Sequence, residues 1–230
     1  MKSKLTFLSL LLSVFLYSFS NFKIQENQAP VVKIISPKNS GVFDQGAPVS
    51  YKISVSDKED GDSKFDEINT KEVLLEVRHM TGKPNKTPQS DAPGLATIMT
   101  SNCINCHGFN SKSIGPSFYE INKRYPATKS NTDSLIKRIR EGSSGIWAGK
   151  EKMPAHPELT AADIKNAVQW IFKNAADPNV NYYIGLEGFF RINTGGKGSY
   201  ILTASYIDHG LKDVPGKRLR GQDMVTIQVK

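Results

Sequence analysis

The feature that most constrains this chain is a run of five residues, Cys103-Ile104-Asn105-Cys106-His107. The chain contains only two cysteines, and both lie in this run with two residues between them. A lone cysteine pair in a secreted protein usually forms a disulfide. Here the adjacent histidine completes the pattern C-x-x-C-H, which is typical of c-type haem attachment. On a tight helical turn, two thiols at this spacing reach the two vinyl groups at one porphyrin edge, and the next imidazole faces the iron.

Two other uses of the pair Cys103 and Cys106 were weighed. A thioredoxin-like dithiol is expected within a strand–helix–strand pattern, and a zinc site needs a second pair of ligands, which this sequence lacks. We therefore predict one covalently attached haem c, with His107 as the first iron ligand.

A six-coordinate haem needs a second axial ligand, usually a methionine or a histidine. Met153 is favoured because it stands in a turn-rich loop, Gly149 to Pro154, directly ahead of a predicted helix. Such a loop can fold over the open face of the haem. Met99 lies just before Cys103 and is expected to pack in the core. His156 is the second candidate ligand, and its alternative role is that of a surface loop residue. Other methionines and histidines of the chain are Met80, Met224, His79 and His209.

Several stretches, in the right order, resemble a class I cytochrome c of the small bacterial monohaem type, over residues from about 94 to 175. They are Cys103–His107, Ile114–Phe118, Ile139–Trp147 and Met153–Pro154. The resemblance implies that the Pro116 carbonyl accepts a hydrogen bond from the proximal imidazole, which would orient the ring and raise its basicity. It also implies that Trp147 packs at the haem edge with its indole N–H near a propionate; the alternative for Trp147 is plain core filling.

Local signals predict helices around these motifs. Asp91 followed by Pro93 is typical of a helix start. A second helix is expected over 131–141, ended by Gly142. Thr160 with Asp163 resembles a capping box, with Asp in place of the usual Glu. It opens a helix with an apolar stripe, and the resemblance to class I cytochromes c implies that this last helix packs against the first.

The first twenty residues have the charged start, short apolar run and small-x-small end of a secretory signal. We expect residues 1–20 to be a signal peptide, with an uncleaved N-terminal anchor as the alternative. No cysteine follows the apolar run, so a lipid anchor is not expected, and no later segment is apolar enough to be a transmembrane segment. The predicted location is periplasmic, with the mature chain soluble.

The flanks of the haem segment alternate apolar and polar residues with the period of β-strands. Each flank alone would form a marginal sheet with one face left bare. Together the two flanks are close in length to the ~100 residues of an immunoglobulin-like (Ig-like) sandwich. Stretches that resemble the opening and closing strands of bacterial Ig-like repeats are 31–37, 48–57, 200–205 and 225–229. The predicted fold class is mixed.

We therefore expect an all-α cytochrome c domain inserted, after the third strand, into an all-β Ig-like sandwich. The domains would be 28–86 and 178–230 for the two parts of the sandwich and 88–177 for the cytochrome. Three independent pieces in a row are the alternative.

The net charge is +8, and export argues against nucleic acid as the partner. The basic residues provide either a solvated face or a docking surface for an acidic redox partner. The acidic stretch 57–67 is expected to be a solvated turn between strands. Calcium binding is the alternative, because hard oxygen ligands lie close together, although their spacing matches no EF-hand.

The predicted function is that of an electron carrier and not an enzyme, because ligation by histidine and methionine leaves no open position on the iron. No catalytic residue is predicted. The pairing of Ig-like strands with a cytochrome resembles the C-terminal part of exported quinone-dependent sugar dehydrogenases of the β-propeller type. This sequence shows no propeller, so a separate dehydrogenase would be the electron donor. The alternative function is a haem enzyme or sensor from whose iron Met153 dissociates.

Overall fold

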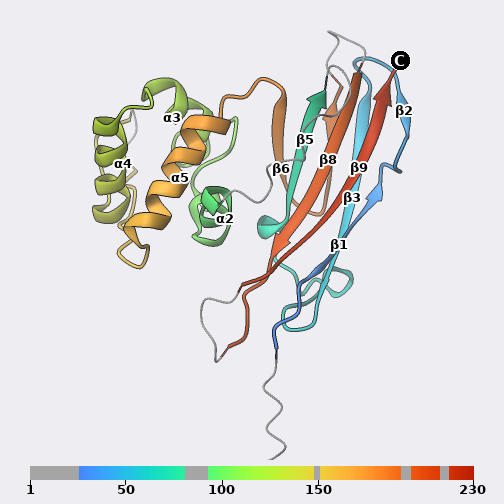
Figure 1. Ribbon diagram of the computed structural model, residues 1–230, viewed down its shortest axis with the longest axis horizontal. Helices are drawn as coiled ribbons and strands as arrows, with labels where there is room; N and C mark the ends of the chain where they lie inside the picture. The colour runs from blue at the N-terminus through green and yellow to red at the C-terminus, as the bar shows by residue number, and fades with distance from the viewer. Residues whose placement is uncertain (1–25, 81–92, 148–150, 193–197, 213–217) are drawn as a thin grey trace, which may run out of the picture.

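Strands from both ends of the chain form one two-sheet sandwich, and a helical part lies beside it (Figure 1). The computed structural model describes residues 26–80, 93–147, 151–192, 198–212 and 218–230. The predicted signal peptide at 1–20 lies outside these residues.

The larger sheet has the strand order β2-β9-β8-β5-β6. Strand β8 lies at its centre and is antiparallel to both neighbours, with Leu202 opposite Val77 of β5 and opposite Val225 of β9. The five strands are β2 (Val42–Phe43), β5 (Leu74–Met80), β6 (Val180–Ile184), β8 (Gly198–Ile207) and β9 (Arg220–Val229).

The smaller sheet is built around β3, which pairs with β1, β4 and β7. Its pairings are antiparallel, and one of them joins the two flanks, because Tyr51 of β3 lies opposite Gly188 of β7. The four strands are β1 (Val31–Ser36), β3 (Pro48–Asp57), β4 (Gly61–Asp62) and β7 (Glu187–Arg191). Two short 3-10 helices, η1 (Ser63–Phe65) and η2 (Thr70–Glu72), follow β4.

The helical part leaves and rejoins the sandwich at two neighbouring strands. It follows β5 and ends before β6, and these strands pair directly, with Arg78 opposite Val180. Five strands precede it rather than the three we expected, because β2 and β4 have only two residues each. A two-residue strand shows no alternation, so the sequence pattern could not reveal it.

Side chains cap the starts of several helices. Ser117 and Glu120 form a capping box that the sequence analysis did not use, and it opens a helix that was not predicted, α3 (Phe118–Arg124). Thr160 accepts from the backbone N–H of Asp163, which confirms the predicted start of α5 (Ala161–Asn174). The remaining helices are α2 (Pro93–Thr100), η3 (Cys103–Asn105) and α4 (Lys129–Glu141). Helix α2 packs against α5, as the sequence predicted.

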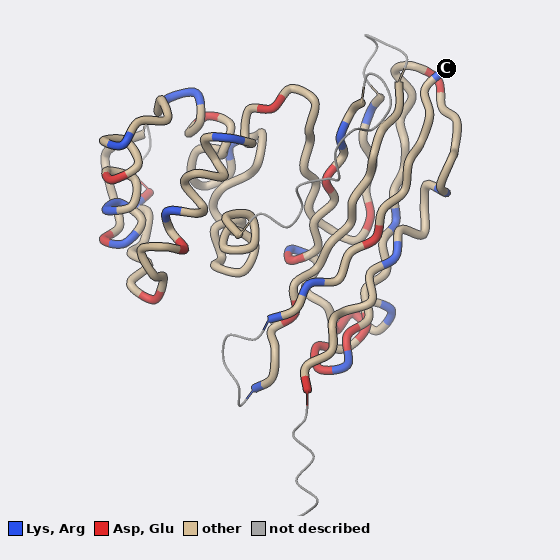
Figure 2. Tube along the Cα trace, in the orientation of Figure 1, with Lys and Arg blue, Asp and Glu red and all other residues tan. Residues whose placement is uncertain are grey.

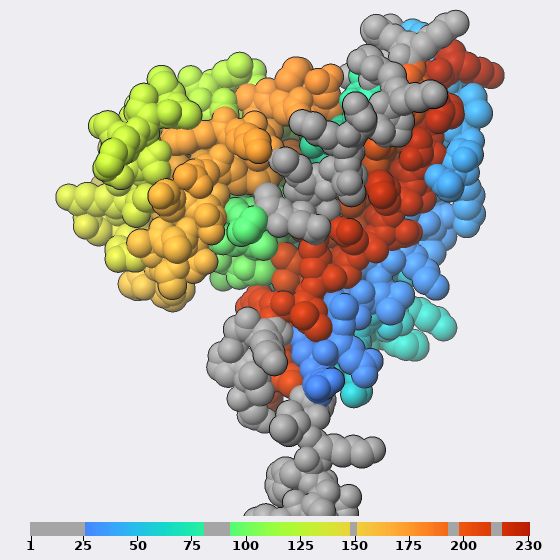
Figure 3. Space-filling model, viewed as in Figure 1, coloured from blue at the N-terminus to red at the C-terminus, as the bar shows by residue number. Residues whose placement is uncertain are grey.

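At β5 and β8 the larger sheet is buried on both faces, which the alternating pattern of these strands did not predict. On β5, Leu75 packs in the core between the two sheets, whereas Leu74 packs with the helices. The second cluster also contains Met99 of α2, Trp170 of α5 and Tyr182 of β6, so the helical part and the sandwich share one apolar interface. Figure 3 shows the helical lobe pressed against the sheet.

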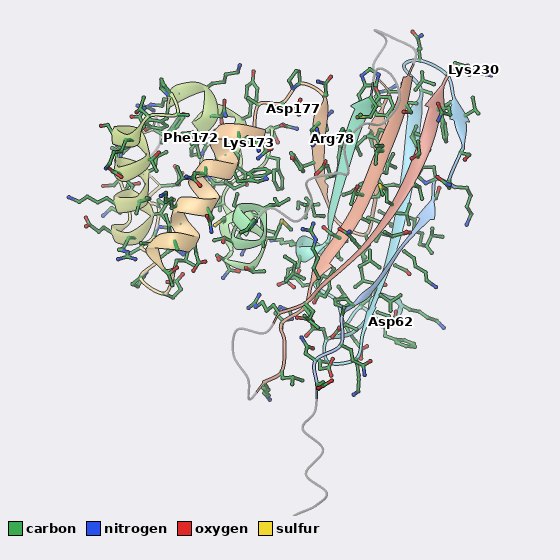
Figure 4. All side chains as sticks on the ribbon, viewed as in Figure 1. Asp62, Arg78, Phe172, Lys173, Asp177 and Lys230 are labelled. Atoms are coloured by element: carbon green, nitrogen blue, oxygen red, sulfur yellow. The ribbon has the colours of Figure 1, made fainter. Side chains whose placement is uncertain are left out.

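Aromatic rings and an ion network hold this interface. The Phe109 ring stacks on Tyr182 of β6, with centroids 4.7 Å apart, and meets Trp170 edge to face at 5.9 Å. Beside them, Arg78 of β5 bonds Asp177 after α5 at 3.2 Å and the buried Glu76 at 3.0 Å (Figure 4). Because the pair Arg78 and Asp177 joins the two parts at the point where the chain returns, the helical part is anchored to the sheet.

Candidate functional site

The two cysteines lie on one helical turn. Cys103 opens η3, and its carbonyl accepts from the N–H groups of Cys106 at 3.2 Å and His107 at 2.9 Å. Asn102 enters the turn in a left-handed conformation with φ of 59°. Both thiols are free and half-buried, and burial raises the pKa of Cys103 to about 11. The turn therefore presents both thiols from one short segment.

The His107 ring is held by the segment that follows it. Its Nδ1 lies 2.6 Å from the carbonyl oxygen of Pro116, and since a carbonyl only accepts, Nδ1 carries the proton and Nε2 keeps a lone pair. The Phe118 ring stacks on it at 5.6 Å. A Cβ at Gly115 would lie 2.7 Å from the ring, so this glycine leaves room for it. Burial lowers the pKa of His107, which favours the neutral imidazole that a metal binds.

The predicted site residues line one cavity of about 610 Å³. Its size falls within the ~300–1,000 Å³ range of ligand and cofactor sites. Apolar side chains of α4 and α5 form much of its wall, among them Leu135, Ile139, Ile164 and Val168. All six predicted site residues line it, namely Cys103, Cys106, His107, Pro116, Trp147 and Met153.

The loop that carries Met153 is tied to the end of α4. Ser143 and Met153 form an isolated antiparallel bridge, with N–H to carbonyl distances of 3.1 and 2.9 Å. Gly142, which ends α4 with φ of 79°, makes this approach possible, since a Cβ there would lie 2.9 Å from the Met153 carbonyl oxygen. His156, the second candidate ligand, lines the same cavity. Residues 148–150 of this loop lie outside the described residues.

A cationic and aromatic group surrounds Trp147. The Arg124 guanidinium stacks 4.4 Å from the centre of the Trp147 ring, and the Tyr125 ring meets it edge to face at 6.3 Å. Arg138 donates to the Tyr125 hydroxyl at 2.8 Å and also lines the cavity. The sequence analysis assigned Arg138 no role at this site. Its position, five residues before Ser143 on the helix that holds the Met153 loop, was the available signal.

The acidic stretch 57–67 lies away from this cavity, at one end of the sandwich, where acidic side chains gather in Figure 2. There Asp60 accepts from the Tyr206 hydroxyl at 2.8 Å and pairs with His209 at 3.1 Å. Within the described ranges, no group of three or more His, Cys, Asp or Glu side chains is arranged to hold a metal ion. Calcium binding by this stretch, the alternative to a solvated turn, stays untested.

The comparisons with known proteins agree on the helical part. The sequence profile of the family "Cytochrome c" matches residues 92–174. Cytochrome c-552 of Hydrogenobacter thermophilus is 35% identical over 86 residues, which cover 34% of this chain and 86% of that protein. Cytochrome c-551 of Azotobacter vinelandii is 36% identical over 78 residues and is covered to 93%. The solved structure of Nitrosomonas europaea cytochrome c552 is 32% identical, covers 34% of this chain and 96% of that chain, and has a TM-score of 0.33.

A thiol pair, a proximal imidazole and an enclosing apolar cavity on one helical domain define a c-type haem protein. The chain belongs to the cytochrome c family through residues 92–174.

The residues present fit the cofactor of this family, one covalently attached haem c. The fit rests on the cavity itself, which is largely apolar and brings both thiols to the same space as an imidazole with its Nε2 lone pair available. None of the helices in the described ranges has both the length and the continuous apolar character of a membrane span.

Proposed function

We propose that this protein is an exported carrier of single electrons, with Cys103 and Cys106 holding the haem and His107 and Met153 as its axial ligands. The observation that carries the proposal is the single apolar cavity, which both thiols, the imidazole and the methionine line together. The bound haem supplies the one-electron chemistry, and homologous cytochromes c are electron carriers.

Each surrounding residue has a proposed role in holding this state. Pro116 keeps the His107 ring oriented through the 2.6 Å contact, which raises the basicity of Nε2 toward the iron. Met153, as a thioether ligand, favours reduced iron and raises the potential. Trp147 and Arg138 present donors on the cavity wall, where both would hydrogen-bond the propionates and Arg138 would also balance their charge. The bridge between Ser143 and Met153 holds the ligand loop, so little reorganisation would accompany electron transfer.

The architecture proposed around this site is a discontinuous Ig-like sandwich, 28–86 and 178–230, with the cytochrome domain 88–177 inserted. Pairing between β3 and β7 and between β5 and β8 supports it. Export follows from the predicted signal peptide at residues 1–20 and supports a periplasmic location.

The proposed partners are redox proteins, with an exported sugar dehydrogenase as the donor. Basic side chains along α3 and α4 support a partner with an acidic face (Figure 2). They are Lys123, Arg124, Lys129, Lys137, Arg138 and Arg140, against Glu120, Asp133 and Glu141. Because exposed charges steer association, the rate of reduction by such a donor should fall with ionic strength.

The test combines a visible spectrum with a midpoint potential on the purified holoprotein. The oxidised protein should show the weak long-wavelength charge-transfer band of methionine-ligated haem, and it should take up one electron reversibly. Replacement of Met153 by Ala should abolish that band. High-spin bands in the wild-type protein would contradict the proposal and would favour an enzyme or sensor.

A further inference from the structure

His156 belongs to a loop, yet it lines the haem cavity and is largely shielded from solvent. It lies three residues after Met153, and only 16% of its side chain is exposed, compared with 61% for its neighbour Glu158. It also lies close enough to His107 for the two rings to influence each other. Burial is the main cause of the lowered pKa of His107, and a charge on His156 lowers it further, while the hydrogen bond to Pro116 opposes both effects. One cavity therefore holds two imidazoles.

Both imidazoles are held in the same manner. His107 donates from Nδ1 to the Pro116 carbonyl at 2.6 Å, and Nδ1 of His156 lies 2.8 Å from Glu158 Oε1. The pKa of Glu158 is lowered by its own backbone N–H and by His156, so its carboxylate is the acceptor at neutral pH. A metal-ligating histidine almost always has its other ring nitrogen bound to a carbonyl or a carboxylate. In each ring, Nε2 is then the nitrogen that can bind a metal.

The backbone keeps His156 within reach of the position that Met153 would occupy. The His156 N–H donates to the carbonyl of Ile139, in the last turn of α4, at 3.0 Å. Only Pro154 and Ala155 separate the two residues, and three residues span at most about 11 Å. An exchange would require movement of the short segment from Met153 to His156.

We propose that His156 is a reserve axial ligand, whose Nε2 takes the sixth position on the haem iron whenever Met153 leaves it. The inference rests on the proposed ligation by His107 and Met153. In the exchange, the bond from the Met153 sulfur breaks and a bond from His156 Nε2 forms. No electron is transferred, and the exchange starts from the neutral His156 ring, whose proton stays on Nδ1 against Glu158 while Nε2 binds.

Two consequences follow for the function. The iron stays six-coordinate after loss of Met153, so small exogenous ligands find no open site. The potential also falls, since an imidazole stabilises oxidised iron more than a thioether does. His156 would then suppress the enzyme-like or sensor-like behaviour that a dissociating methionine otherwise permits.

The decisive experiment compares Met153→Ala with the double variant Met153→Ala/His156→Ala, both as oxidised holoproteins at neutral pH. We expect the single variant to be low-spin with a lowered midpoint potential, and the double variant to be high-spin. A high-spin single variant overturns the inference, and so does a low-spin double variant, because another side chain would then be the ligand. The matched control is Met153→Ala/His209→Ala, which should stay low-spin because His209 does not line the haem cavity and is paired with Asp60 and Glu72.

A second measurement tests the inference even if the Met153 variants lose their haem or fail to fold. In His156→Ala alone, the methionine band should persist at neutral pH, and partial unfolding by denaturant should convert the protein directly to a high-spin form. The wild-type protein should pass through a low-spin form, and azide should bind this form about tenfold more weakly than it binds the variant. Identical transitions in both proteins would refute the role of His156. Absence of the methionine band in the wild-type protein would instead refute the proposed function.

Discussion

The sandwich and the helical part bury their apolar residues in different ways. The core between the two sheets closes on itself, with Val55, Leu75 and Leu202 fully buried. In the helical part, by contrast, α4 has no fully buried residue, and its Leu135 and Ile139 line the haem cavity. The comparison teaches that the haem completes the core of the helical part, whereas the sandwich is complete without it.

The largest expected effect comes from loss of the haem. Replacement of both Cys103 and Cys106 by Ser should prevent stable retention of the cofactor, and the helical part should lose its fixed packing because binding energy of a prosthetic group is also folding energy. Hydrogen exchange should show amide protection in α4 and α5 falling to that of fraying segments, while β5 and β8 stay protected. Equal protection of the helices with and without haem would contradict the conclusion that the haem completes the core of the helical part.

A cavity made in the core of the sandwich should lower the stability of the protein without changing the haem site. Leu202→Ala removes a side chain with 0% exposure and should lower the free energy of unfolding by about 2–5 kcal/mol. The haem spectrum of the folded protein should not change. Val42→Ala, at 59% exposure, is the control and should change stability by about 0.5 kcal/mol or less. Denaturant titration followed by fluorescence and by the haem band would show whether the two parts respond separately.

Substitutions at two glycines with positive φ can distinguish the cost of backbone strain from an effect on the position of Met153. Gly142→Ala and Gly145→Ala should each cost about 1–3 kcal/mol because their φ angles are 79° and 69°. Only at Gly142 would the new Cβ also press on the Met153 carbonyl, at 2.9 Å; at Gly145 nothing lies within 4 Å. We expect both variants to melt at a lower temperature but only Gly142→Ala to weaken the methionine band. An equal spectral change in both would refute the positioning role of Gly142.

The smallest expected effect is a pH dependence confined to the sandwich. His209 lies between Asp60 and Glu72, at 3.1 and 3.2 Å. Burial opposes its protonation, but these carboxylates outweigh burial and raise its pKa.

Because the folded pKa of His209 is raised, its stabilisation is fully present below the unfolded value of about 6.5 and is lost as pH rises through the folded pKa. His209 is half-exposed, so the contribution should be below about 1 kcal/mol. His209→Asn should flatten the pH dependence of sandwich unfolding and leave the haem spectrum unchanged. A variant that retains the wild-type pH dependence would show that another group titrates.

The sequence by itself determined the features that depend on neighbours along the chain. The attachment turn, the start of α5 at Thr160 and the end of α4 at Gly142 need only a few consecutive residues, and each matches its prediction. The short strands β2 and β4 were not predicted, because two residues show no periodicity. Helix α3 was not predicted either, although Ser117 and Glu120 form its capping box.

Only the tertiary structure decided what depends on distant segments. It placed β5 between β6 and β8, brought Phe109 against Tyr182, and turned His156 into the cavity beside Met153. An alternating strand pattern cannot tell whether its second face meets water or a helix, and a loop histidine carries no sign of what surrounds it. Long-range packing supplies that information, because burial is a property of the assembled surfaces and not of the local chain.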